Sequence, residues 1–264
     1  MASTVWSGHL SFGLISIPVR LSVAARPQSV SFNMLHRTDN SRLKQQYTCQ
    51  SCNQIVDRDE TVKGFEYAKD QYIVIEPSEI QQIQPETNRT MEILEFIPID
   101  QIDPIYFDSS YYLTPELAGQ KAYSLVAKAM ENKKFVAIAK LFMHNREYTV
   151  FIRHFEGGLV LHTMFYSTEV RQPETQKFST EEPTPGELKM AGQFLEALVG
   201  DWEPDKYSDS FQKELQDLIT MKIQGQVAPK KEKKKRSTPI PDIQEAIRQS
   251  LKAIEEKKLK ASKK

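Results

Sequence analysis

Three basic side chains in one short segment are the first residues in this 264-residue chain whose type and spacing predict a chemistry. The segment HRTDNSRLKQQYTC contains Arg37, Arg42 and Lys44. Guanidinium and ammonium groups neutralise phosphates, and each neutralised phosphate on duplex DNA releases condensed counterions. The segment therefore predicts contacts to a nucleic-acid backbone, with an ordinary solvated loop as the alternative.

Other basic residues in the first two thirds of the chain are weaker candidates for the same role. Arg20 lies on the polar face of a predicted strand, and Arg146 lies in the turn HNRE between two predicted strands. Lys133 and Lys134 lie where a predicted helix meets a strand. A single surface Lys or Arg is more often a solvated charge than a ligand contact. Each of these four is predicted to contact DNA with that alternative open.

The densest basic cluster lies near the C-terminus. Residues 229–264 contain 13 Lys and Arg and 5 Asp and Glu, so their net charge is +8. Because the whole chain is neutral, the remaining residues have a net charge of −8. Phosphate affinity follows the local density of basic side chains and not the charge of the whole chain. We expect sequence-independent DNA affinity from the side chains of Lys230, Lys231, Lys233, Lys234, Lys235 and Arg236.

Cys49 and Cys52 have the spacing of one half of a tetrahedral zinc site. They are the only cysteines, which is too few for a disulfide framework and favours a reducing compartment. His36 is a candidate third ligand, and a fourth would have to be Asp, water or a residue from elsewhere. Two interpretations stay open: a structural zinc on these three residues, or two reduced thiols near a turn. No other cofactor is predicted.

The sequence contains none of the common catalytic motifs. It lacks the phosphate loop G-x-x-x-x-G-K-[ST], a G-x-G-x-x-G after a strand, H-E-x-x-H and the G-x-S-x-G elbow. Asp57, Asp59 and Glu60 could hold Mg²⁺ for a nuclease, although a charged turn explains them better. We therefore expect a binding protein and not an enzyme.

Alternating apolar and polar residues predict the strands that must position these groups. In ISIPVRLSV (15–23) every second residue is apolar, which is typical of a half-buried strand. A helix is expected to begin with Thr114 as N-cap and Pro115 at its first position. Gly157 and Gly158 indicate a hairpin between the last two of the further predicted strands, which are 71–76, 91–99, 135–143, 147–154 and 158–166.

In the C-terminal third, the apolar residues recur at a different spacing. Apolar residues spaced by about 3.6 predict two helices within residues 185–226, ended by Gly200 and Gly225. Residues 227–241 have almost no apolar side chains and predict a disordered basic linker. Residues 242–264 predict a basic tail with one short amphipathic helix. No run resembles a signal peptide or a membrane helix, so we expect a cytoplasmic, nucleoid-associated protein with no membrane partner.

Several motifs in the same order resemble the bacterial Ku family over nearly the whole chain, roughly residues 3–226. The N-terminal WSGHLSFGLISIPVRL is similar to the opening signature of that family, and VKGFEY (62–67) is similar to its second. The other matching motifs are YYLTPE, KAYSLVAKAM, YSTEVR, ELKMAGQFLEAL and YSDSFQKELQDLITMKIQG.

The resemblance implies an α+β fold with a β-barrel core of the Ku or SPOC-like type over residues 1–172. A bridging arm would occupy about residues 34–66 and bring Arg37, Arg42 and Lys44 to the DNA. The family also implies a ring-shaped homodimer that binds double-stranded DNA ends of any sequence, protects them, and recruits an ATP-dependent DNA ligase for non-homologous end joining. The alternative is a zinc-dependent regulatory protein that binds DNA at internal sites.

Overall fold

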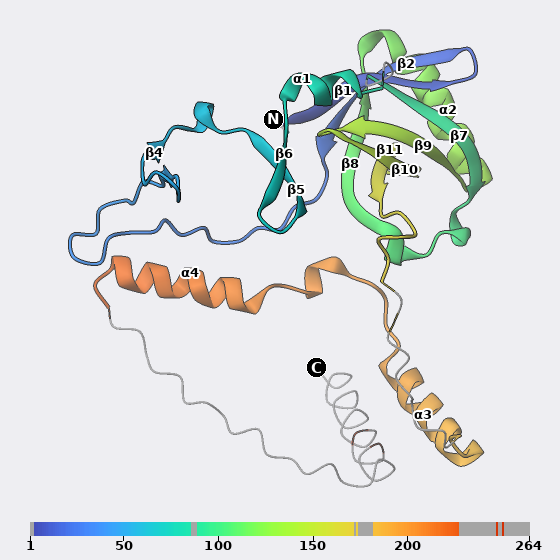
Figure 1. Ribbon diagram of the computed structural model, residues 1–264. Coiled ribbons are helices and arrows are strands. Elements are labelled where there is room, and N and C mark those ends of the chain that lie inside the picture. The colour runs from blue at the N-terminus through green and yellow to red at the C-terminus, as the bar shows by residue number, and fades with distance from the viewer. Residues whose placement is uncertain are drawn as a thin grey trace. The chain divides into compact units, whose positions relative to one another are not determined.

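The computed structural model describes residues 3–85, 89–171, 173 and 182–226, together with two helical positions, Ile247 and Ser250. The chain forms two compact units (Figure 1). The first contains residues 1–28 and 32–172, and the second contains residues 29–31 and everything from residue 173 onward. No helix among the described residues is both long and apolar enough to cross a membrane.

Seven strands of the first unit close into a barrel, which confirms the predicted α+β barrel class. Neighbouring strands are antiparallel except where β1 meets β7, and there His9 pairs with Thr90 in a parallel register. Around the barrel the strands are β1 (Thr4–Phe12), β2 (Ile15–Val23), β8 (Phe107–Pro115), β11 (Gly158–Met164), β10 (Arg146–Phe155), β9 (Phe135–Met143) and β7 (Thr90–Pro98).

The barrel interior is filled by alternate residues of these strands. Leu10, Ile17, Leu141 and Leu161 are fully buried there. Helix α2 (Gln120–Lys133) packs one face against the same core through Tyr123, Val126, Ala127 and Met130. Burial of this apolar surface is the main favourable contribution to the stability of the barrel.

The Tyr123 hydroxyl lies between the backbones of two barrel strands. It donates a hydrogen bond to the Leu113 carbonyl (2.6 Å) and accepts one from the Leu159 N–H (2.7 Å). Leu113 and Leu159 are opposite each other in the register of β8 and β11, so the hydroxyl replaces a direct bond between them. The phenol therefore completes the sheet at a buried position.

Tyr123→Phe should lower the free energy of unfolding by about 1–3 kcal/mol, because two buried backbone groups lose their partner. Urea denaturation followed by circular dichroism measures this. Tyr112→Phe is the matched control, since that ring is 44% exposed, and it should change stability by less than about 0.5 kcal/mol. Equal stability of Tyr123→Phe and the parent would show that the strands close up and bond directly.

Most of the predicted elements are confirmed within two residues, but the start of the predicted helix is wrong. Thr114 and Pro115 belong to β8, where they pair with Arg20 and Val19 of β2. The backbone stays extended because neighbouring strand β2 supplies its hydrogen-bond partners, and α2 begins only at Gln120. The predicted hairpin is present, although its two turn residues are Glu156 and Gly157.

A long segment leaves the barrel after β2 and returns to it before β7. We call residues 24–76 the arm (Figure 1). It contains two separate two-stranded sheets, and it is followed by the short helix α1 (Pro77–Gln82). The sheets pair β3 (Tyr47–Thr48) with β4 (Ile55–Val56), and β5 (Lys63–Ala68) with β6 (Gln71–Ile75).

The second unit contains the two predicted C-terminal helices. Helix α3 (Pro185–Leu198) begins at Thr184, whose hydroxyl accepts a hydrogen bond from the Glu187 N–H. It ends before Gly200. Helix α4 (Ser210–Ile223) is capped by Asp209 and is followed by Gly225 with a φ of 73°. Neither helix contains a buried residue.

Candidate nucleic-acid interface

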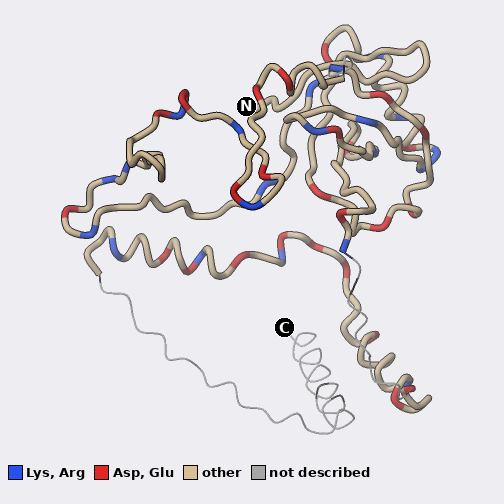
Figure 2. Tube along the Cα trace, viewed as in Figure 1, with Lys and Arg blue, Asp and Glu red and all other residues tan. Residues whose placement is uncertain are grey.

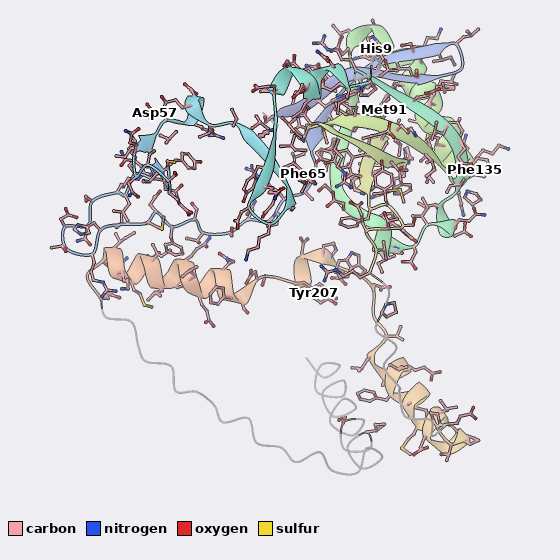
Figure 3. The ribbon with its side chains drawn as sticks, viewed as in Figure 1. His9, Asp57, Phe65, Met91, Phe135 and Tyr207 are labelled. Carbon is pink, nitrogen blue, oxygen red and sulfur yellow. The ribbon has the colours of Figure 1, made fainter. Side chains whose placement is uncertain are left out.

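Charge is segregated along the arm. Its outgoing limb, residues 24–56, contains four basic residues, which include Arg26 and Arg37, and a single acidic residue, Asp39. Its return limb, residues 57–76, contains six acidic and three basic residues. Figure 2 shows the basic positions along the outgoing limb. Asp57, labelled in Figure 3, begins the acidic limb and precedes the 3₁₀ turn η1 (Arg58–Glu60). The outgoing limb is therefore the surface of the arm that favours phosphate.

A turn in the middle of the outgoing limb contains Arg37 and leads into Arg42, two of the predicted phosphate contacts. Asp39 Oδ1 accepts hydrogen bonds from the Ser41 N–H (3.0 Å) and hydroxyl (2.8 Å), and the backbone bond comes first among the causes that lower the pKa of this carboxyl. The only acidic group of the limb is thus engaged in the turn. Arg42 donates to Asn33 Oδ1 (2.7 Å). The ion pairs among the described residues include none that involves Arg37, Arg42 or Lys44.

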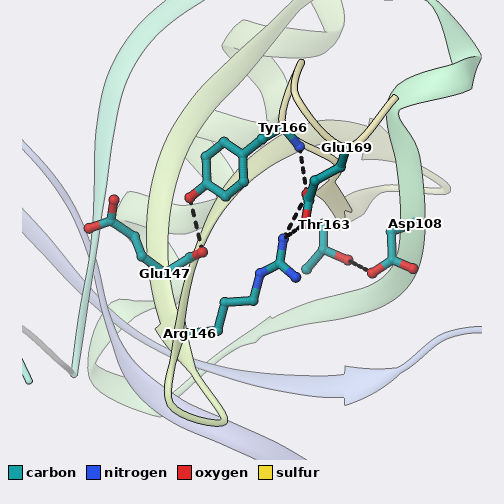
Figure 4. Close-up of polar contacts among 6 residues, drawn as sticks. All are labelled: Asp108, Arg146, Glu147, Thr163, Tyr166 and Glu169. Atoms are coloured by element: carbon teal, nitrogen blue, oxygen red, sulfur yellow. Dashed lines mark hydrogen bonds and ion pairs between the residues drawn. The ribbon is translucent and has the colours of Figure 1, made fainter. Parts of the chain in front are cut away.

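Arg146, one of the predicted DNA contacts, forms an ion pair within the barrel unit. Its Nη2 lies 2.6 Å and 2.7 Å from the two carboxylate oxygens of Glu169 (Figure 4). Its guanidinium lies over the rings of Tyr148 and Tyr166. The ion pair joins the turn between β9 and β10 to the segment after β11. A phosphate at Arg146 would have to compete with the Glu169 carboxylate, and the DNA contact of Arg146 stays a prediction.

No ion pair among the described residues joins the remaining single candidates to Arg37, Arg42 or Lys44. Arg20 Nε lies 3.7 Å from Glu116 Oε1. Lys133 ends α2, and Lys134 caps that helix with a left-handed backbone (φ 55°). Lys230, Lys231, Lys233, Lys234, Lys235 and Arg236, the linker 227–241 and most of the tail 242–264 lie outside the described residues.

The two cysteines lie in the β3–β4 hairpin. The Cys49 N–H bonds to the Gln54 carbonyl and the Asn53 N–H bonds to the Cys49 carbonyl, both at 2.9 Å. Backbone N–H groups of Cys52 and Ser51 point at the Cys49 sulfur and lower its pKa, which favours the thiolate that binds metals. His36 instead contacts Asp39 (Nδ1 to Oδ1, 3.1 Å). The described residues contain no cluster of three or more potential metal ligands, so His36 does not join the cysteines within one chain.

Ser110 and His162 are hydrogen-bonded on the barrel wall, but the position of the proton on the His162 ring does not suit catalysis. Arg153 Nε donates to His162 Nε2 (3.0 Å), so that nitrogen must be the unprotonated one. Nδ1 then carries the proton and donates to the Ser110 hydroxyl oxygen (2.8 Å). The ring cannot accept the serine proton, as a nucleophile would require.

Burial, with a smaller contribution from Arg153, lowers the pKa of His162 to about 4. The folded protein therefore prefers a neutral ring, whereas the unfolded chain binds a proton below pH about 6.5. Stability from this group is present above that pH and is lost as pH falls toward the folded pKa, by roughly 3 kcal/mol in total.

Chemical unfolding of the parent and His162→Gln at several pH values isolates this group. The parent should be the more stable protein at pH about 7.5, and the gap should shrink by pH about 4.5 at up to about 1.4 kcal/mol per unit. If the difference in stability between the parent and His162→Gln stays constant over this range, the ring takes up its proton equally in the folded and unfolded states.

One arm residue was missed by the sequence reasoning. Arg26 lies on the outgoing limb, and no acidic residue precedes Asp39 in that limb. The signal was the absence of acidic neighbours and not a cluster of basic ones. The DNA contacts of Arg26, Arg37, Arg42 and Lys44 are still predictions.

The fold and this surface define a β-barrel protein with an arm whose outgoing limb is basic. A family model described as the Ku70/Ku80 beta-barrel domain matches residues 11–190. The chain is 45% identical over 258 residues to the non-homologous end joining protein Ku of Koribacter versatilis, covering 98% of this chain and 89% of that protein. The corresponding protein of Solibacter usitatus is 42% identical, and the match covers 98% of this chain and 97% of that protein. The one of Mycobacterium tuberculosis is 32% identical, and the match covers 84% of this chain and 83% of that protein. The chain belongs to the Ku family.

Proposed function

We propose that this protein binds ends of double-stranded DNA for non-homologous end joining, without reading their sequence. The basic outgoing limb of the arm is the observation that carries the proposal, because a protein that accepts any break must take its affinity from phosphates. Relatives that bear the name non-homologous end joining protein Ku support the process. The protein protects and holds the ends and performs no chemistry on them.

The binding form is a ring of two identical chains closed by their arms. The β5–β6 sheet supports this, because Phe65 and Ile73 lie opposite each other in its register and are 62% and 54% exposed. Figure 3 labels Phe65 on this sheet. A hairpin of two strands is only marginally stable alone in water. A second copy of the chain that covers this apolar face would stabilise the sheet and enclose the DNA.

Sedimentation or light scattering without DNA tests the ring. The parent should have twice the 30.4 kDa mass of one chain, and Phe65→Ser with Ile73→Ser should shift it toward one chain. Leu14→Ser is the matched control, since that side chain is fully exposed in the turn between β1 and β2. A parent of single-chain mass at micromolar concentration would exclude a preformed ring.

The same ring would recruit an ATP-dependent DNA ligase through the helical region 185–226. Helix α3 supports this because Leu188, Leu195 and Leu198 are exposed along it. An apolar stripe of this kind is suited to a protein partner. Leu188→Ser with Leu195→Ser should abolish stimulation of ligation while leaving DNA binding intact. Equal stimulation would place the ligase contact elsewhere.

A zinc-dependent regulatory protein that binds internal sites is the second candidate. The hairpin that directs two N–H groups at the Cys49 sulfur supports it, as does the spacing to Cys52. Further ligands would have to be water or residues other than those that the structure describes around the two cysteines. Stoichiometric zinc with loss of folding on chelation, together with a preferred internal sequence, would favour it over end binding.

A further inference from the structure

Two aromatic side chains form an exposed stack in the connection between α3 and α4. The rings of Trp202 and Tyr207 are 5.1 Å apart and inclined by 21°, and they are 74% and 66% exposed. Every residue from 201 to 210 is exposed. The 3₁₀ turn η5 (Pro204–Lys206) separates the two rings in sequence, and an ion pair between Glu203 and Lys206 (2.6 Å) spans it. The stack is therefore formed in advance of any ligand.

Carboxylates surround this stack. Residues 201–209 contain four acidic residues and one basic residue, Lys206. Glu203 pairs with that lysine, and Asp209 caps α4 by accepting the Gln212 N–H (3.0 Å). Asp201 and Asp205 have no bonding partner among the described residues.

The charge decides which ligand fits the stack. An exposed aromatic pair could stack on nucleobases. The carboxylates, however, repel the phosphates that would accompany those bases. A lysine or arginine side chain is attracted both by the ring faces and by the carboxylates. The surface therefore fits a peptide rich in Lys and Arg.

We propose that this aromatic and acidic surface, residues 201–209, binds the basic segment 230–236 of the chain itself, and that DNA competes for that segment. Segment 230–236 contains six basic residues and one acidic residue, which complements the surface. Its link to DNA rests on the proposed function, whereas the contact itself does not.

Chain length permits the contact. Helix α4 is about 20 Å long at about 1.5 Å per residue. The seven steps from Ile223 to Lys230 span at most about 25 Å when extended. The basic segment can therefore return along α4 to its beginning, where the aromatic stack lies.

Tryptic cleavage within 230–236 of the full chain, without DNA, tests the contact. Asp201→Asn with Asp205→Asn should raise the cleavage rate several-fold at low salt, and the difference should fade by about 0.5 M salt, where charges are screened beyond about 4 Å. Asp57→Asn with Asp59→Asn makes the same charge change on the arm and should leave the rate unchanged. Equal rates in the parent and both variants, or a difference that does not depend on salt, would overturn the proposal.

A double-mutant cycle tests the competition with DNA. Asp201→Asn with Asp205→Asn should raise affinity for linear duplex several-fold when segment 230–236 is intact. The same pair of changes should have no effect when the six basic residues of the segment are replaced by Gln. The same gain in duplex affinity with and without the six basic side chains would overturn the competition. A chain that fails to bind DNA ends would still give a decisive tryptic result, so the two proposals fail separately.

Discussion

Replacing Arg37, Arg42 and Lys44 together with Gln should weaken binding to linear duplex of every sequence and make that binding less sensitive to salt. If each side chain neutralises one phosphate, the slope of log affinity against log salt falls by up to about 0.9 per contact, or about 2.7 per chain. Fluorescence anisotropy on two duplexes of unrelated sequence measures it. Both duplexes should lose affinity by the same factor, because phosphates carry no sequence information.

The arm provides a matched control for this variant. Arg58, Lys63 and Lys69 are the three basic residues of the return limb, where six acidic residues outnumber them. Replacing these three with Gln removes the same charge but should leave the salt slope nearly unchanged. Equal losses in the two triple variants would mean that net charge, and not the outgoing limb, governs the affinity.

Gly8→Ala should cause the largest loss of stability of any single methyl addition in the barrel. A Cβ at this position would lie 2.1 Å from the Arg89 carbonyl oxygen and 2.6 Å from the Trp6 ring. The same carbonyl accepts the His9 N–H (2.9 Å) where β1 meets β7. The methyl group would therefore push apart the strands that close the barrel, at an expected cost of about 3 kcal/mol or more.

Thermal and urea unfolding of Gly8→Ala measure this cost. Gly192→Ala is the control, because a Cβ at that position in α3 meets nothing within 4 Å. It should be neutral or stabilise α3 by up to about 1 kcal/mol. A Gly8→Ala protein with the unfolding midpoint of the parent would mean that the barrel can relax at its parallel seam.

Strands with an alternating pattern or a continuous apolar run were predictable from the sequence, whereas β1 and the end of β8 were not. Segments 15–23 and 135–143 coincide with β2 and β9, because one face of each is buried in the barrel. Strand β1 was not predicted as a separate strand. Its residues Gly8 and His9 pair with Val19 and Pro18 of β2, and His9 also pairs with Thr90, about eighty positions away. The helix predicted from Thr114 failed, since β2 supplies its partners.

The sequence shows local charge but not the partners that the fold supplies. Arg37, Arg42 and Lys44 lie on the outgoing limb, and their contacts to DNA stay predictions. Arg146 looked equivalent in sequence, but its partner Glu169 comes 23 residues later and is reached only through the fold. Sequence spacing likewise suggested His36 beside the cysteines, whereas a turn directs it to Asp39. The partner of Arg146 therefore depends on the fold, whereas that of His36 depends on a local turn.

A gel-shift comparison of one duplex in linear and covalently closed circular form, at equal length and salt, tests the central claim most directly. A ring that loads over ends should bind the linear form of any sequence, leave the circle free, and bind the circle once a single cut has opened both of its strands. Equal binding of the closed circle and the linear duplex would contradict the account.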